Sequence, residues 1–391
     1  MPFAAALSTE ANSRTAFEAL CTQTLKPLGG PPDLALAFYS NHHRDSVADL
    51  VKQAAEILQP RCLLGCPGEA IVGNGREVED GPALSLWLGR WTKGVTLTPF
   101  HLAHEPTPEG HSIMGWPYQL SEAADPSQQL MLLLADPYTF PVDPFLKEMN
   151  EAHRGVRVMG GMASGVRGEG QCRMMLGNRV VTDGAVGVLL QGALGVRGVV
   201  SQGCRPIGKH MIVTRARDNI ILELSGKPPL TQLQAIWEEV SPHDRELMRR
   251  GLHVGRVINE YKSEFQRGDF LIRNVIGLDS GSGALAITDR VRVGQTVQFQ
   301  VRDAESADED LHELLQIDLS AHEAKPAGAL LFTCNGRGTR LFPQPDHDAG
   351  VIRTEAGELP LAGFFAQGEL GPIGGQNFIH GFTASVVLFE E

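Results

Sequence analysis

The chain has 391 residues, of which 42% are hydrophobic, so it can bury a large core, and its length predicts two or three domains. With 34 Lys and Arg residues against 46 Asp and Glu residues, the net charge of -12 excludes the basic footprint of a nucleic-acid-binding protein. The amino-terminal segment lacks the features of a signal peptide, and no stretch is apolar enough to span a membrane, so we expect a cytoplasmic protein without a membrane anchor.

The first predicted unit begins with a buried strand at residues 34–38, which leads through a polar turn into a helix with apolar residues at spacings of three and four. A short apolar run at residues 62–66 follows and contains Gly65 and Cys66. Two β-rich runs then come at residues 81–89 and 95–102. This pattern predicts the order strand, helix, strand, strand, strand.

The same order recurs between residues 130 and 200. A strand at 130–135 precedes a helix, and the next apolar run ends at Gly160 and Gly161. Because a repeat of this kind fixes the architecture, we expect a duplicated domain whose halves pack their sheets together. Its expected bounds are residues 30–225, with halves at about 30–125 and 126–225.

A second domain is expected at residues 226–391. It should begin with a helix capped by Thr231 and continue with short alternating strands between residues 252 and 301. Ser306 and Glu309 form a capping-box pattern that predicts another helix.

A third echo of the repeat follows near the carboxyl end, with a strand at 329–334 and two later runs that resemble residues 63–69 and 184–192. The predicted fold class is α/β in the α+β sense. It consists of duplicated strand-helix-strand-strand units with packed mixed sheets, plus a carboxyl-terminal α/β domain that carries the related third unit.

Standard catalytic motifs are missing from the sequence. There is no phosphate-binding G-x-x-x-x-G-K-[ST] loop, and Ser164 lies one position away from the serine of a nucleophile elbow. His101, His104 and His111 lie near one another in sequence, but their spacing matches no particular metal site. We therefore predict neither a cofactor nor a metal. Six scattered cysteines without a C-x-x-C pair indicate reduced thiols.

Strands that end in small or thiol residues followed by glycine are the feature shared by the repeated units. Such glycines permit a tight turn or a close approach to the backbone, and pockets of layered α/β proteins commonly lie at strand ends. We therefore predict a ligand pocket there. The candidate ligand-binding residues are Gly65, Cys66, Glu69, Gly160, Gly161, Arg205, Cys334, Gly336, Arg337, Gly338, Glu369 and His380.

Two of these residues have alternative interpretations. Arg337 lies between glycines and can present its planar guanidinium to a ligand carboxylate or form a structural ion pair with a residue such as Glu369. Cys334 would be a nucleophile only if a nearby cation lowered its pKa, and the sequence around it offers no general base. A thiol-dependent enzyme that uses Cys334 or Cys66 is therefore an alternative, and we favour Cys334 as a wall of the pocket.

Taken together, these motifs resemble the FIST family (F-box and intracellular signal transduction proteins) over residues 30–390. The resemblance rests on four groups of residues: Gly65-Cys66 with Gly68-Glu69, Gly160-Gly161 with Ser164-Gly165, residues 203–208, and Phe332–Gly338 with residues 363–372 and 380–384.

The resemblance implies a sensory module that binds a small ligand such as an amino acid. The sequence holds no kinase, cyclase or F-box segment, so the expected output is an unknown signalling partner protein or a change in homo-oligomeric assembly. An interaction scaffold without a ligand remains a further alternative.

Overall fold

The computed structural model describes residues 2–91, 94–107, 110–122, 125, 128–262, 264–265 and 268–390. Its contacts divide the chain into two compact units. The first unit comprises Met1–Val200, Leu311–Ile379 and Thr383–Glu391, and the second comprises Ser201–Asp310 and His380–Phe382. Among the helices of these described ranges, none is both long and apolar enough to cross a membrane.

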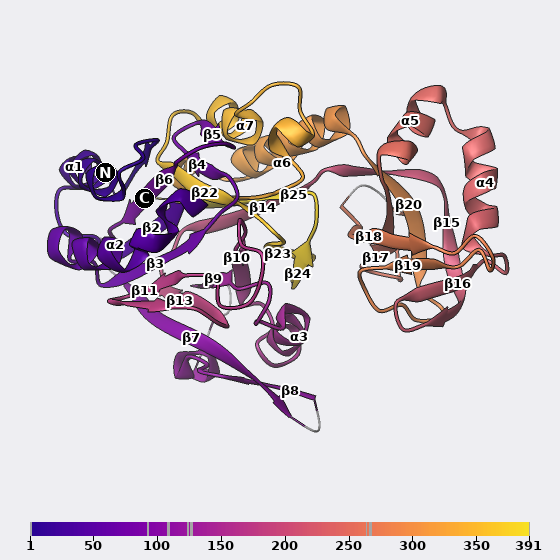
Figure 1. Ribbon diagram of the computed structural model, residues 1–391, viewed down its shortest axis with the longest axis horizontal. Coiled ribbons are helices and arrows are strands. Elements are labelled where there is room, and N and C mark those ends of the chain that lie inside the picture. Colours follow the sequence, from indigo (N-terminus) through magenta and orange to yellow (C-terminus); the bar gives the residue numbers. More distant parts are fainter. Residues whose placement is uncertain are drawn as a thin grey trace. The chain divides into compact units, whose positions relative to one another are not determined.

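Three segments, called repeats 1 to 3, share one order of elements (Figure 1). Repeat 1 contains β2 (Leu34–Tyr39), α2 (Val47–Gln53), β3 (Cys62–Pro67), β4 (Ile71–Gly73), β5 (Arg76–Val78), β6 (Leu84–Gly89) and β7 (Val95–Thr107). Repeat 2 contains β9 (Gln129–Ala135), α3 (Val142–Ala152), β10 (Arg157–Met162), β11 (Met174–Leu176), β12 (Arg179–Val181), β13 (Ala185–Gly192) and β14 (Val196–Gln202). Repeat 3 contains β21 (Pro326–Cys334), α7 (His347–Ala356), β22 (Leu361–Ala366), β23 (Glu369–Ile373), β24 (Gln376–His380) and β25 (Thr383–Glu390).

Other elements flank the repeats. They are β1 (Phe3–Ser8), α1 (Ser13–Leu28), β8 (Gly110–Met114) and α6 (Ala304–Ala321), with short helical turns at Asn41–Ser46, Ala54–Leu58, Tyr118–Glu122 and Gly338–Arg340. The helix α6 begins two residues before Ser306, whose hydroxyl donates to Asp303 Oδ2. The predicted capping box at Ser306 was therefore wrong.

Each repeat builds the centre of one sheet and completes another. Within every repeat, the first strand pairs in parallel with the strand after the helix and in antiparallel fashion with the strand after the hairpin, in the orders β6-β2-β3, β13-β9-β10 and β25-β21-β22. The hairpins between them cross to a neighbouring sheet. Hairpin β4–β5 of repeat 1 pairs with β22, hairpin β11–β12 of repeat 2 pairs with β3, and hairpin β23–β24 of repeat 3 pairs with β10.

The outer strands pair in the opposite direction, with the following repeat, since β7 pairs with β13, and β14 lies beside β25. The α+β fold class with mixed sheets, expected from the sequence, is confirmed. The contacts place the third repeat with the first two in one unit, whereas the chain order suggested a separate domain. The boundary at residues 225 and 226 stays a prediction.

Both faces of each central strand are buried, which explains why these strands are continuously apolar in sequence. Leu36, Leu132 and Leu330, one from each first strand, belong to a single cluster to which all three sheets contribute. The intervening residues of the same strands face outward, toward α1 and α2 in the first sheet, α3 in the second, and α6 and α7 in the third (Figure 1).

One glycine occurs at the same place in each repeat, on the second strand and opposite a residue of the first. Gly65 pairs with Ala37, Gly160 with Leu133, and Gly363 with Leu331. A Cβ atom at these glycines would lie 2.4, 2.0 and 1.8 Å from the carbonyl oxygen of the facing residue. Real Cβ contacts do not become this short, so any side chain would force the parallel strands apart.

The second unit is a closed barrel with strand order β15-β16-β19-β18-β17-β20. Its strands are β15 (Cys204–Arg217), β16 (Ile220–Leu224), β17 (Leu252–Val257), β18 (Phe270–Leu278), β19 (Leu285–Ile287) and β20 (Thr296–Arg302). The helices α4 (Pro229–Glu239) and α5 (Pro242–Arg250) contribute Leu233, Ile236 and Leu247 to its core. The helix α4 begins at Pro229, so the cap predicted at Thr231 was wrong because the prolines already start the helix.

Candidate functional site

A cavity of about 330 Å³ lies in the first unit, where strands of all three repeats end. Residues 40–42 follow β2, residues 68–69 follow β3, and residues 165–167 lie in the turn after β10. Repeat 3 adds Asn335 after β21 and Gln367 after β22, while residues 79–81 follow the hairpin β4–β5. Equivalent strand ends therefore converge on one cavity, as the repeat pattern predicted.

One buried hydroxyl connects the three repeats beside this cavity. Ser164 of repeat 2 is 0% exposed, and its Oγ accepts a hydrogen bond of 2.7 Å from the backbone N–H of Glu69 in repeat 1. The same hydroxyl donates to the carbonyl of Phe365 in repeat 3. Ser164 thus positions the strand ends of all three repeats.

Gly165 follows with φ +72 and packs against the turn at Gly68, where an added Cβ would lie 3.2 Å from the Gly68 oxygen. The positive φ and the close neighbour both favour glycine here. The turns of repeats 1 and 2 can therefore approach each other closely enough to form one wall.

Replacing Ser164 with alanine should lower the free energy of unfolding by about 1–3 kcal/mol, because the Phe365 carbonyl and the partly buried Glu69 N–H lose their partner. Urea denaturation measures this change. Thr354→Ala is the matched control, since its exposed hydroxyl also bonds a backbone carbonyl. Equal stability losses in the two variants would contradict the bridging role of Ser164.

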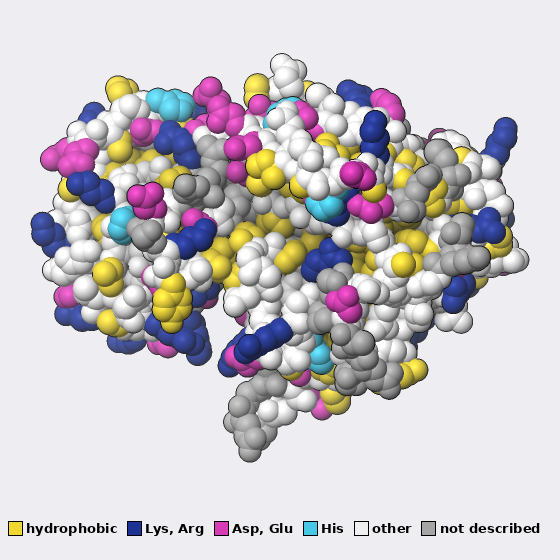
Figure 2. Space-filling view, turned by 180° about the vertical axis from the view of Figure 1, so that it is seen from behind, with side chains coloured by type: hydrophobic (Ala, Val, Ile, Leu, Met, Phe, Trp, Pro, Cys, Tyr) yellow, Lys and Arg dark blue, Asp and Glu magenta, His cyan; other side chains and the backbone are white. Residues whose placement is uncertain are grey.

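The cavity lining is charged. Among its described residues, Glu69, Glu79, Asp80 and Arg167 carry a formal charge near neutral pH. Glu69 forms an ion pair with Arg340, and Glu79 accepts hydrogen bonds from the N–H and the Oγ1 of Thr339 at 2.8 and 2.7 Å. On the face seen in Figure 2, basic and acidic side chains are interspersed.

Asp80 and Arg167 differ from the other two charged residues of the lining. Both side chains are exposed, and neither has a hydrogen-bond or ion-pair partner among the residues that the structure describes. The cavity therefore offers one carboxylate and one guanidinium that a ligand can contact without breaking an internal bond.

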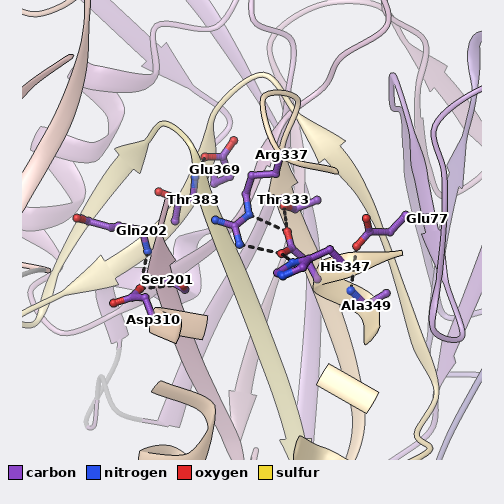
Figure 3. A network of polar contacts seen from close by, with 11 residues as sticks. Glu77, Ser201, Gln202, Asp310, Thr333, Arg337, His347, Ala349, Glu369 and Thr383 are labelled. Atoms are coloured by element: carbon purple, nitrogen blue, oxygen red, sulfur yellow. Dashed lines mark hydrogen bonds and ion pairs between the residues drawn. The ribbon is translucent and has the colours of Figure 1, made fainter. Parts of the chain in front are cut away.

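Arg337, which Figure 3 labels within a network of polar contacts, forms a buried ion pair with Asp348. Its Nε and Nη2 donate to the two carboxylate oxygens at 2.8 and 2.7 Å, and both side chains are 0% exposed. Thr333 Oγ1 also donates to Asp348 at 2.6 Å, and the guanidinium lies 5.2 Å from the ring centroid of Phe342. Of the two alternatives for Arg337, the structure shows the ion pair, with Asp348 rather than Glu369 as the bidentate partner.

Burial alone would raise the pKa of the Asp348 carboxyl, but the charge and hydrogen bonds of Arg337 outweigh this effect and hold the pKa well below its usual value. Asp348 is therefore ionised, and Arg337 is committed to it. The pair fixes the segment after β21 to the first turn of α7.

Glu77 lies beside this pair and behaves differently. Burial, followed by the nearby Asp348 charge, raises the pKa of Glu77 to about 8. Its Oε1 accepts a 2.9 Å hydrogen bond from the Ala349 N–H at the start of α7. A protonated Glu77 thus avoids a second buried negative charge next to Asp348.

The stability of the protein should consequently fall as pH rises from about 5 to about 8. In that window the folded state binds the Glu77 proton and the unfolded chain does not, so Glu77 alone contributes a loss of at most about 1.4 kcal/mol per pH unit. Urea titrations at several pH values measure the slope, and Glu77→Gln should flatten it. The exposed Glu18→Gln variant is the control, and an unchanged slope in Glu77→Gln would contradict the assignment.

The two cysteines considered as nucleophiles lie in different surroundings. Cys66 is 0% exposed within the central core, and burial raises the pKa of its thiol well above the usual value. Cys334 is partly buried at the end of β21, where its Sγ accepts a 3.4 Å hydrogen bond from the Gly336 N–H.

Glu369 is 0% exposed and accepts from the Thr383 N–H at 3.2 Å, and burial raises the pKa of its carboxyl well above the usual value.

Iodoacetamide should modify Cys334 before Cys66 in the folded protein, by roughly tenfold or more in rate, because a buried neutral thiol reacts only after local opening. Mass spectrometry of timed samples measures both rates. The urea-unfolded chain is the control, in which the cysteines should react alike. Faster modification of Cys66 in the folded protein would contradict the burial argument.

Of the residues predicted from sequence, Glu69 lines the cavity. Gly65 and Gly160 serve the parallel strand contacts, and Cys66 belongs to the core. Gly161 packs against Ala366: a Cβ atom added at Gly161 would lie 2.9 Å from the Ala366 Cβ. Ligand contacts by the remaining candidates stay predictions.

Two of those candidates belong to the second unit. Arg205 donates to Asp303 Oδ2 at 2.6 Å and also pairs with Asp244, while His380 is 4% exposed.

No group of three or more metal-binding side chains occurs in the described ranges, and the His111 side chain lies outside them.

Several lining residues were missed by the sequence analysis. They are Ser40, Asn41, His42, Gly68, Glu79, Asp80, Gly81, Gly165, Val166, Arg167, Asn335 and Gln367. Five of them come directly after a strand, so comparing the residues after equivalent strands of the repeats would have found Ser40, Gly68, Glu79, Asn335 and Gln367. Asp80 and Arg167 carry no motif of their own.

The first unit thus combines three interleaved strand-helix-strand segments with a cavity at their strand ends. Residues 33–227 match the FIST N domain, and residues 233–372 match the FIST C domain. The chain belongs to the FIST family, whose domains are sensory domains of signal-transduction proteins. The resemblance seen in the sequence motifs is confirmed.

Similar proteins occur in mycobacteria. The uncharacterized protein Rv0628c of Mycobacterium tuberculosis strain H37Rv is 43% identical over 378 residues, which cover 97% of this chain and 96% of the relative. The uncharacterized protein Mb0898c of Mycobacterium bovis is 44% identical over 363 residues, which cover 93% of this chain and 92% of the relative. Both alignments cover nearly the full length of the two proteins compared.

Proposed function

We propose that this protein is a cytosolic sensor that binds a small molecule of the amino acid type in the cavity at the strand ends. The family membership supports a sensory role, and the cavity supports a small ligand, since about 330 Å³ falls within the range of small-molecule sites. The observation that carries the proposal is the convergence of strand ends from three repeats on this polar cavity.

The charged lining suits a zwitterion. Arg167 can bind a carboxylate through two parallel hydrogen bonds, and Asp80 can accept from an ammonium group. An α-amino acid carries both groups within one small molecule. Backbone groups of the turns at Gly68 and Gly165 add polar contacts that need no side chain.

The signal would pass to a partner protein or to a second copy of the chain. Ligand binding joins turns from all three repeats, and Ser164 already couples those turns. A ligand that tightens these contacts would stabilise the first unit as a whole.

A thermal-shift screen with the twenty amino acids tests the proposal. A ligand at a hundred times its Kd should stabilise the folded state by about 2.7 kcal/mol, which is a measurable rise in Tm. Arg167→Ala and Asp80→Asn should each weaken binding by about tenfold or more, the loss expected for a charge-assisted hydrogen bond.

Arg14→Ala serves as the control, because Arg14 is an exposed arginine paired with Glu18 and does not line the cavity. Unchanged affinity in both cavity variants, or no stabilisation by any amino acid, would contradict the proposed site.

A further inference from the structure

The segment Gly338–Arg340 covers two carboxylates of the cavity lining. Thr339 holds Glu79 through its N–H and its hydroxyl, and Arg340 holds Glu69. The second amino group of Arg340 donates to the carbonyl of Asn335 at 2.9 Å, and Asn335 is itself a lining residue. A guanidinium tethered to repeat 3 is therefore seated on a lining carboxylate of repeat 1.

The ion pair between Arg340 and Glu69 is suited to being exchanged. The side chains are 57% and 39% exposed, so water screens the attraction and either partner can leave at little cost. The buried pair of Arg337 and Asp348, three residues earlier, is 0% exposed and holds the start of the same segment in place. The segment thus has one fixed end and one end that can be released.

The charge of the cavity changes when Arg340 leaves. Glu69, Glu79 and Asp80 would then face a single guanidinium, that of Arg167. One zwitterionic amino acid satisfies Asp80 and Arg167 and leaves Glu69 as an uncompensated carboxylate. A second cationic group on the ligand would compensate it.

We propose that the ligand is a basic α-amino acid whose side-chain ammonium or guanidinium binds Glu69 in place of Arg340. This inference rests on the proposed function and specifies its ligand class. Arg340 acts as a tethered competitor of the ligand, so binding releases the Arg340 side chain from Glu69, while Thr339 keeps its hydrogen bonds to Glu79.

Release of the Arg340 side chain from Glu69 would change the surface beside the cavity. The segment connects β21 to α7, and Gly338 within it has φ +58, a conformation that other residues rarely adopt. Binding of a cation at Glu69 would therefore alter the surface next to the cavity while the Arg337–Asp348 pair keeps the underlying fold intact.

Isothermal titration calorimetry with L-arginine, L-lysine, L-citrulline and L-glutamate tests the proposal. L-citrulline is the matched uncharged analogue of L-arginine. We expect L-arginine or L-lysine to bind at least about tenfold more tightly than L-citrulline, as for loss of a charged hydrogen-bond partner. Glu69→Gln should remove this difference.

The variant Arg340→Ala tests whether Arg340 competes with the ligand, through the direction in which the affinity changes. Removing a tethered competitor should tighten binding of the basic amino acid by about two- to fivefold, the fold-change that an exposed ion pair supplies. Arg14→Ala, which removes another exposed ion pair, should leave the affinity unchanged. Because the Arg340 side chain is largely exposed, the variant should fold normally.

Weaker or unchanged binding in Arg340→Ala would overturn the competition, as would equal affinities for L-arginine and L-citrulline. Tight binding of L-glutamate or a neutral amino acid that depends on Arg167 and Asp80 would reject the basic ligand and retain the proposed function. Lack of binding by all four probes and by the other amino acids would reject both.

Discussion

The exchange of hairpins between the repeats is the constraint on which the structure of the first unit depends. Each sheet contains the three central strands of one repeat and a hairpin of another, so no repeat completes its sheet alone. Because the exchange is cyclic, repeat 3 contacts repeats 1 and 2 although the whole barrel lies between them in sequence. The central core contains apolar residues from all three sheets, and burial of these residues stabilises the closed arrangement.

Closure of the three sheets also explains where the cavity lies and what it can recognise. Parallel strands at the centre of each sheet end on the same side, and the turns that follow them meet around Ser164. The turns carry polar side chains because strand ends reach water, whereas the strands themselves are buried on both faces. A site with carboxylates on one repeat and guanidinium groups on the others follows from this convergence.

Much of the architecture could be predicted from local sequence patterns. The apolar runs of β2, β9 and β21 and their shared succession of elements identified the repeats, because strand length and turn residues are local properties. Helix starts were less predictable. The helix α6 begins before Ser306, since the Asp303 carbonyl already accepts from the Ala307 N–H in its first turn, and no local pattern decides which of two nearby polar residues starts a helix.

The sequence by itself determined the apolar strands, the α+β class and the family. Only the tertiary structure decided which polar residues meet at the strand ends. Arg337 was a candidate ligand contact in sequence, but the fold brings Asp348 of α7 within bonding distance and buries both. Arg340, which carried no motif, is placed on Glu69 of another repeat. Such pairings depend on contacts between residues up to 271 positions apart, and no local pattern encodes them.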